Sequence, residues 1–128
     1  MEEKVVLRLR ISAADVHYGS GLVAGAKIAS LFGDAATALL IKHDGDEGLF
    51  VAYQSLEFKA PVYAGDFLEV QASIEKTGNS SRTISFEAWK IIAANPQKGP
   101  SAADWLDERQ LVATARGTCV VPKERQRR

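Results

Sequence analysis

Residues 22–41, LVAGAKIASLFGDAATALLI, decide the fold of this chain. The stretch runs for twenty residues without proline and is apolar on almost every side, which is typical of a helix that other elements bury. Twenty such residues can also span a bilayer, but a stripe of polar side chains at helical spacing makes that costly. The stripe consists of Lys27, Ser30, Asp34 and Thr37. We therefore predict one long buried helix and no transmembrane segment.

Five other segments have the composition of strands. Residues 4–11, KVVLRLRI, alternate apolar and basic side chains with a period of two, as a half-buried strand requires. Four strand-like segments follow the helix, at 49–58, 67–76, 81–93 and 111–121. The connections at 61–66 and 78–80 are short enough for antiparallel neighbours, whereas 95–108, which contains two prolines, predicts a long excursion.

This order of elements predicts the architecture. A helix that is apolar all round needs cover on most sides, and the strands before and after it can supply a sheet that curls around it. We expect an α+β hotdog fold, a five-stranded antiparallel sheet wrapped around one long central helix, as a single domain over residues 1–128. Such a sheet leaves an edge strand uncovered, so we also expect a homodimer joined edge to edge. Residues 123–128 are expected to form a flexible basic tail.

The composition excludes several classes of function. Hydrophobic residues make up 46% and charged residues 25% of the 128 residues, as in an ordinary globular protein. The 16 basic and 16 acidic side chains cancel, which argues against nucleic acid or a membrane surface as a partner. Cys119 is the single cysteine, and no signal-peptide pattern opens the sequence. We therefore expect a cytoplasmic protein.

Asp34 is the leading catalytic candidate. It is the only acid between Asp15 and Asp44, and burial halfway along an apolar helix would favour its protonated form and suit it to proton transfer. The alternative is that Asp34 marks a solvent-facing edge of the helix, because it shares its stripe with Lys27. The residue pattern leaves both interpretations open.

Glu57 is the second candidate carboxylate. Strand alternation places it on the same face as Leu49, Val51 and Tyr53, where it could receive a cationic group. A salt bridge with Lys59 at the rim explains the residue equally well.

His17 and Tyr63 are further candidates. His17 precedes the helix in a glycine-flanked loop, and a histidine there suits either proton transfer or a capping and packing role. Tyr63 offers a hydroxyl at a strand entry, where aromatic side chains are more often part of the core.

Metal sites and serine nucleophiles are not predicted. Residues 44–48, DGDEG, begin like a calcium loop, but Leu49 stands where that loop needs glycine. Ser20 lies between glycines, yet Tyr18 stands where a nucleophile elbow has its first glycine. Two histidines and one cysteine are too few for a closed zinc site, so Cys119 is interpreted as a structural thiol.

Six phrases of the sequence form a recognisable set. They are DVHYG (15–19), LVAGA (22–26), LFGD (31–34), DGDEGLF (44–50), APVYAGDF (60–67) and FEAWK (86–90). Together they resemble the 3-aminobutyryl-CoA ammonia-lyases of lysine fermentation and the related beta-alanyl-CoA ammonia-lyases, over about residues 7–122. The helix acid, the strand entry at 61–66 and the turn at 78–81 are more loosely similar to hotdog acyl-CoA thioesterases.

The resemblance implies reversible elimination of ammonia from a short 3-aminoacyl-CoA, such as 3-aminobutyryl-CoA, to crotonyl-CoA. It implies no metal and no cofactor, because CoA is part of the substrate. Helix-start amides would hold the enolate-like oxygen. In this scheme the oxygen is held by Val23, Ala24 and Gly25, the alpha proton is moved by Asp34, and the amino group is handled by Glu57 with His17, with Tyr63 beside the substrate. The roles of Asp34 and Glu57 could be exchanged.

The turn that follows the third predicted strand is the candidate CoA-binding segment. It combines backbone donors with a guanidinium and consists of Gly78, Asn79, Ser80, Ser81 and Arg82. The alternative is an ordinary hairpin turn with an exposed arginine. The basic tail either meets the CoA phosphates or is solvated.

Two positions depart from the lyase pattern. Ala24 stands where the lyases usually carry a polar side chain, and Ala38 stands where they carry an acid. The departures keep two alternatives open: an acyl-CoA thioesterase in which Asp34 activates water, and a non-catalytic acyl-CoA-binding protein. The resemblance also implies that homodimers assemble into a tetramer or hexamer.

Overall fold

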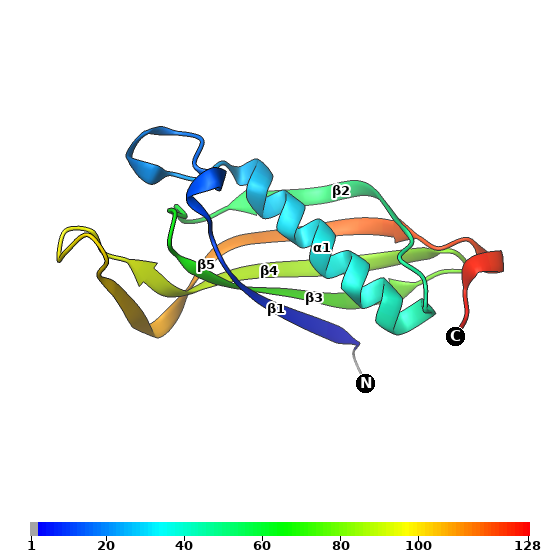
Figure 1. Ribbon diagram of the computed structural model, residues 1–128. Coiled ribbons are helices and arrows are strands. Elements are labelled where there is room, and N and C mark those ends of the chain that lie inside the picture. The colour runs from blue at the N-terminus through cyan, green and yellow to red at the C-terminus, as the bar shows by residue number, and fades with distance from the viewer. Residues whose placement is uncertain (1–2) are drawn as a thin grey trace.

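The computed structural model describes residues 3–128, so Met1 and Glu2, the opening of the predicted domain, lie outside the described residues. Within that range one five-stranded antiparallel sheet wraps around one long helix, as predicted (Figure 1). The strands lie in the order β1-β3-β4-β5-β2. The elements are β1 (Lys4–Arg10), η1 (Ala13–Asp15), η2 (Gly19–Gly21), α1 (Gly25–Asp44), β2 (Leu49–Phe58), β3 (Phe67–Thr77), β4 (Ser81–Ala94), β5 (Ala103–Val120) and η3 (Lys123–Arg125).

The helix occupies a later stretch than the sequence predicts, 25–44 in place of 22–41. Leu22 pairs with Tyr63 in an isolated β-bridge, so the residues before the helix are extended. At the other end the helix continues to Asp44 and stops at Gly45, whose positive φ of 73° provides a left-handed C-cap. No helix among the described residues is long and apolar enough to cross a membrane.

The core lies between α1 and the inner face of the sheet. Phe32 of the helix meets Phe86 of β4 with ring centroids 5.1 Å apart, and both side chains are buried. Alternate residues of β3 and β4 cover the rest of the helix: Leu68, Val70, Ala72, Ile84 and Ala88. Each large apolar side chain buried in this way contributes about 1.5–3 kcal/mol, which explains why the apolar helix is stable only inside the sheet.

The predicted excursion at 95–108 is wrong in its length. Strand β5 already begins at Ala103, which pairs with Ala94, and the ladder continues through Trp105 opposite Ile92. Both prolines lie in the short loop at 95–102, which is therefore the whole connection. The two prolines suggested a loop over the whole of 95–108, but residues 103–110 extend an exposed two-stranded ribbon.

The basic C-terminal segment is not a free tail in the structure. Its backbone turns through η3, and the amide of Arg127 donates to the carbonyl oxygen of Asp44 at 2.8 Å. The guanidinium of Arg128 donates to the carbonyl of Lys42 at 2.8 Å. The last carbonyls of a helix lack intrahelical partners and carry partial negative charge, so cationic residues are well suited to meet them.

Candidate active site

The start of α1 offers unpartnered backbone donors. Ala24 is the N-cap and provides no side-chain cap, and the amide of Lys27 donates to the carbonyl of Ala24 at 3.0 Å, so the amides of Gly25 and Ala26 are the ones open to a ligand. Phe58, from the end of β2, lies directly on Gly25, where a Cβ would overlap its ring. Only glycine fits this position without moving the ring.

A largely apolar cavity of about 490 Å³ lies beside the helix start. Its walls include Leu22, Val23, Ile28, Phe58, Val62 and Val112. Val23, Ala24 and Gly25 lie together beside space for a small apolar group. The prediction that Val23 holds the oxyanion is wrong, because its amide already donates to the carbonyl of Val62 at 2.9 Å.

His17 and Tyr63 lie near this cavity without lining it. The exposed His17 ring meets the ring of Tyr18 edge-on at 4.7 Å, and it is Tyr18 that lines the cavity. Tyr63 lines a separate hollow of about 680 Å³ together with Gly21 and the 95–102 loop. The predicted roles of His17 and Tyr63 remain predictions.

Asp34 lies on the exposed face of α1 and not in the core. The residues of α1 that are exposed along this stripe are Ala26, Ser30, Asp34, Thr37 and Ile41. The burial expected at Asp34 is therefore absent from the single chain, because the curved sheet covers only the opposite side of the helix. Nine residues separate Asp34 from Gly25, which is about 13 Å along the helix axis.

Glu57 faces away from the helix. Register shifts between Phe50 and Ala52 and between Tyr53 and Ser55 break the strand alternation on which the predicted face depended. Glu57 is paired with Thr114, which in turn faces Glu87 across the sheet.

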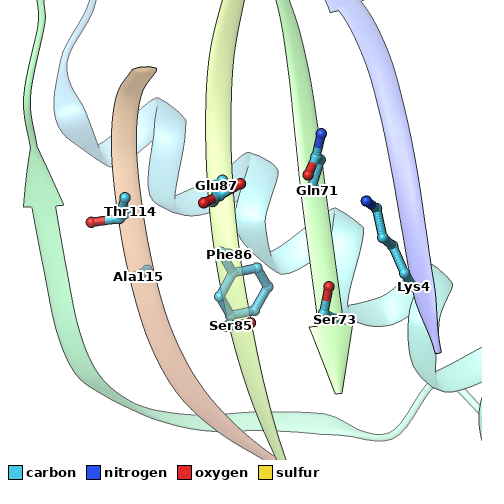
Figure 2. Close-up of a pocket in the computed structure, with 8 residues that line it drawn as sticks. All are labelled: Lys4, Gln71, Ser73, Ser85, Phe86, Glu87, Thr114 and Ala115. Carbon is cyan, nitrogen blue, oxygen red and sulfur yellow. The ribbon is translucent and has the colours of Figure 1, made fainter. Parts of the chain in front are cut away.

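Figure 2 shows Thr114 and Glu87 lining a shallow hollow of about 390 Å³ on the side of the sheet opposite α1. Glu57 lies 3.6 Å from the ammonium of Lys59, so the alternative of a rim salt bridge is the one that the structure shows.

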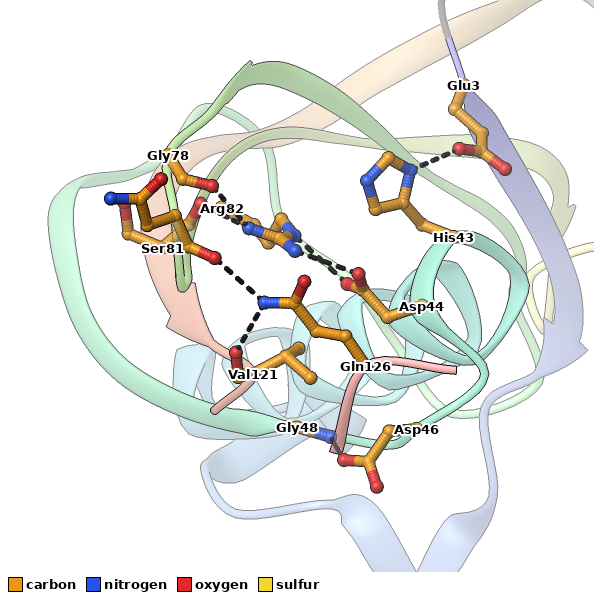
Figure 3. A network of polar contacts seen from close by, with 11 residues as sticks. Glu3, His43, Asp44, Asp46, Gly48, Gly78, Ser81, Arg82, Val121 and Gln126 are labelled. Carbon is orange, nitrogen blue, oxygen red and sulfur yellow. Dashed lines mark hydrogen bonds and ion pairs between the residues drawn. The ribbon is translucent and has the colours of Figure 1, made fainter. Parts of the chain in front are cut away.

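The turn at 78–82 lies at the carboxyl-terminal end of α1, and Arg82 is not available to a ligand (Figure 3). Its guanidinium holds both carboxylate oxygens of Asp44, at 3.0 and 2.8 Å, and donates to the carbonyls of Gly78 and Ser81 at 2.9 Å each. The side chain is only 3% exposed. The prediction that Arg82 contacts CoA is therefore wrong. The alternative, an ordinary hairpin turn with an exposed arginine, is also wrong for this residue because Arg82 is buried.

The other turn residues are exposed, so their CoA role stays a prediction: Gly78, Asn79, Ser80 and Ser81. Because α1 has 20 residues, this turn and the helix start are separated by about 30 Å within one chain.

Burial disfavours the charged forms of two side chains near the core. Burial raises the pKa of the Cys119 thiol to about 11, in agreement with a structural role. Burial, and secondarily the neighbouring Cys119, raises the pKa of Tyr53 to about 12, and its hydroxyl donates to the carbonyl of Ala29 at 2.9 Å.

The sequence interpretation missed three residues around the helix start. Phe58 covers Gly25, and a buried pair of Asp66 and Lys90 holds the neighbouring loop. The Pro-Val-x-x-Gly-Asp phrase contains Asp66, but its partner is 24 residues away on another strand and no local pattern indicates the pairing.

One helix wrapped by a five-stranded antiparallel sheet, with an open helix start beside an apolar cavity, defines a hotdog-fold protein. A family model described as the thioesterase superfamily matches residues 20–91. A 3-aminobutyryl-CoA ammonia lyase from Acetoanaerobium sticklandii is 55% identical over 125 residues, which cover 98% of this chain and 99% of the relative.

Two solved structures extend the comparison. The beta-alanyl-CoA:ammonia lyase from Clostridium propionicum has a TM-score of 0.91 and 42% identity, covering 98% of this chain and 90% of that chain. A hexameric broad-specificity acyl-coenzyme A thioesterase has a TM-score of 0.72 and 25% identity, covering 90% of this chain and 77% of that chain. The chain belongs to the thioesterase superfamily and, within it, to the family of the 3-aminobutyryl-CoA and beta-alanyl-CoA ammonia lyases.

Proposed function

We propose that this chain reversibly eliminates ammonia from a short 3-aminoacyl-CoA, giving crotonyl-CoA or a close enoyl-CoA. The observation that carries the proposal is 55% identity to a 3-aminobutyryl-CoA ammonia lyase over nearly the whole of both chains. The reducing cytoplasm, where CoA thioesters are made and used, is the proposed location, and the buried single thiol of Cys119 fits it.

The helix start supplies the electrostatic part of the reaction. The thioester oxygen is placed on the open amides after Ala24, where the helix dipole and the N–H groups stabilise the charge that develops on it. A base takes the proton from the carbon next to the thioester carbonyl, and the electrons of that bond form the new double bond as the C3–N bond breaks. The amino group is bound as an ammonium, so the nitrogen leaves with the electron pair of the C3–N bond as neutral ammonia, and the base passes the proton that it has taken to solvent. The proposed reaction requires neither a metal nor an organic cofactor.

Asp34 is the proposed base, and it acts on a substrate held by a second copy of the chain. Within one chain Asp34 lies about 13 Å along the helix axis from Gly25, too far for its side chain to touch a thioester held there. Its exposed position allows it to face a neighbouring subunit. Glu57 and His17 retain their proposed role with the amino group, and Glu57 acts only across an interface because it faces away from α1.

The edge strand β2 is the proposed place where the second copy joins. Its free edge carries exposed apolar side chains, including Leu49 at 65%, Val51 at 51% and Phe58 at 54% exposed. The other edge strand, β1, is shorter and carries basic side chains that discourage pairing. Edge-to-edge pairing through β2 would form a homodimer with a continuous sheet, and further assembly into a tetramer or hexamer fits the hexameric thioesterase found among the structural relatives.

One experiment tests the proposal. The purified protein is incubated with crotonyl-CoA and ammonium while the enoyl absorbance and free thiol are followed together. Loss of the enoyl signal without thiol is the expected result. Release of thiol would instead identify an acyl-CoA thioesterase, the activity suggested by the superfamily match. Binding of crotonyl-CoA without either signal would identify a non-catalytic acyl-CoA binder.

A further inference from the structure

A buried lysine lies beside the loop that borders the helix start. The Lys90 ammonium is 3.1 Å from a carboxylate oxygen of Asp66, and the two side chains are only 7% and 1% exposed. The same ammonium donates to the carbonyl of Pro61 at 2.8 Å and lies 5.6 Å from the centre of the Tyr63 ring. Lys90 therefore contacts the loop of residues 61–66 at its beginning, its middle and its end.

Asp66 ties the same loop to the sheet. One oxygen accepts from the amide of Tyr63 at 2.8 Å, and the other accepts from the amide of Ala94 at 2.9 Å. Because Lys90 and Ala94 both belong to β4, the ion pair fastens the loop to that strand at two points. Removing one partner of a buried ion pair is strongly unfavourable, so we expect the loop to shift when Lys90 is replaced by an apolar residue.

The loop in turn holds the residues that lead into the helix. The amide of Val23 donates to the carbonyl of Val62 at 2.9 Å, and the amide of Ala64 donates to the carbonyl of Gly21 at 3.1 Å. Val23 directly precedes Ala24, the N-cap of α1. The position of the first helix amides therefore depends on contacts that begin at Lys90.

We infer that Lys90 is a positioning residue for the lyase reaction, acting through the 61–66 loop on the amides at the start of α1. The inference rests on the proposed function. Charge on the thioester oxygen develops mainly in the transition state, so displaced amides lower kcat more than they raise KM. If Lys90 were only structural, its loss would change stability and would not lower kcat relative to KM.

The matched control is the other buried ion pair. Arg82 and Asp44 form an equally buried cation–carboxylate pair at the far end of α1, about 30 Å from the helix start. Lys90→Met and Arg82→Met each remove one buried cation, and both are expected to lower Tm. At a temperature where both are folded, Lys90→Met is expected to lower kcat about a hundredfold with little change in KM, because a misplacement of about 1 Å has that effect. Arg82→Met is expected to keep kcat within about twofold. Because Arg82 donates to the carbonyls of Gly78 and Ser81 in the predicted CoA-binding turn, its effect is expected on KM for the CoA substrate and not on kcat.

Equal kcat in the two variants would overturn the inference. Lys90→Arg keeps the charge but brings a planar head group, and its kcat is expected between those of the wild type and Lys90→Met, at unchanged KM. If the Met variants fail to fold, Lys90→Arg and Arg82→Lys give the same comparison.

Hydrogen exchange separates this inference from the proposed function, because it needs no activity. Faster exchange of the hydrogen-bonded amides of Val23, Lys27 and Ala64 in the Lys90 variants and not in the Arg82 variants supports the positioning role, even if the wild type proves inactive as a lyase. Unchanged exchange there would overturn it.

Discussion

At its amino-terminal end α1 begins after Ala24 without a side-chain cap, whereas at its carboxyl-terminal end three of the last four carbonyls accept a hydrogen bond from the chain that follows. The amide of Gly45 donates to Ile41, the amide of Arg127 to Asp44, and the guanidinium of Arg128 to Lys42. One helix therefore has one end left open and one end closed by its own chain. The open end faces an apolar cavity, and the closed end faces a polar network (Figure 3).

A buried ion pair lies beside each end of α1, but the two pairs hold different segments of the chain in place. Arg82 ties the helix itself to β4 through Asp44, and Lys90 ties a loop to β4 through Asp66. The first pair stabilises the closed end directly. The second leaves the helix amides free while fixing the chain that leads to them, which is what a binding site needs.

The largest expected effect is on kcat, and it tests Asp34 as the base in a site built from two copies of the chain. Asp34→Asn is expected to lower kcat by about 10²–10⁴, the range for loss of a general base. Because the side chain is exposed, the fold and the oligomer should survive, as circular dichroism and size-exclusion chromatography would check. Near-normal turnover would rule out Asp34 as the base.

Mixing two inactive variants tests the same division more sharply. Gly25→Val places a side chain against Phe58 at the open end and is expected to be inactive. When it is refolded together with Asp34→Asn, random pairing leaves about a quarter of the sites with an intact helix start and an intact Asp34 from different copies. Recovery of about that share of activity is expected. Mixtures that stay inactive would place both groups in one chain.

The second effect concerns the closed end. Asp44→Ala leaves the Arg82 guanidinium buried without its carboxylate, so we expect it to lower the free energy of unfolding by about 3–5 kcal/mol. Chemical denaturation measures this loss. Asp46→Ala, which removes a local contact to the Gly48 amide, is the control and should have a smaller effect. A kcat that falls in Asp44→Ala under folded conditions would contradict the separation of the two ends.

The fold could be predicted because its main signals are local. The apolar stretch at 22–41 and the β-rich segments at 49–58 and 81–93 carry their own periodicity, and these segments appear in the structure with small shifts. The shift of the helix start could not be predicted, since it depends on the bridge between Leu22 and Tyr63, which are far apart in sequence. The early start of β5 likewise depends on pairing with β4.

The site was less predictable than the fold. The position of the helix-start residues follows from the loop and the helix pattern, but the direction of Glu57 depends on two strand irregularities that leave no mark on the sequence. Arg82 looked like a ligand because its turn is polar, and only the distant Asp44 shows why it is buried. The polar stripe did indicate that Asp34 could be exposed, so that alternative was the better guide to its surroundings.

The smallest expected effect lies at neither end of the helix. Glu69 of β3 accepts from Arg8 at 2.8 Å and from Arg109 at 2.8 Å, and the hydrogen bond from Arg8 is the main cause that lowers the pKa of its carboxyl below the usual 4.5. Because the folded pKa is the lower one, its contribution to stability is complete above about pH 4.5 and is lost as the pH falls through the folded value. Arg8 is 71% exposed, so the contribution should be at most about 1 kcal/mol.

Glu69→Gln provides the measurement for this group. The free energy of unfolding of the wild type and the variant is compared from about pH 7 down to about pH 3. The difference should be largest near neutral pH and shrink on acidification, while kcat stays unchanged because Glu69 lies on the face of the sheet opposite α1. A difference that does not vary with pH would show that the ion pairs of Glu69 contribute nothing through its charge. A change in kcat would instead show that the outer face of the sheet is coupled to the helix start, and it would contradict the separation of these two regions.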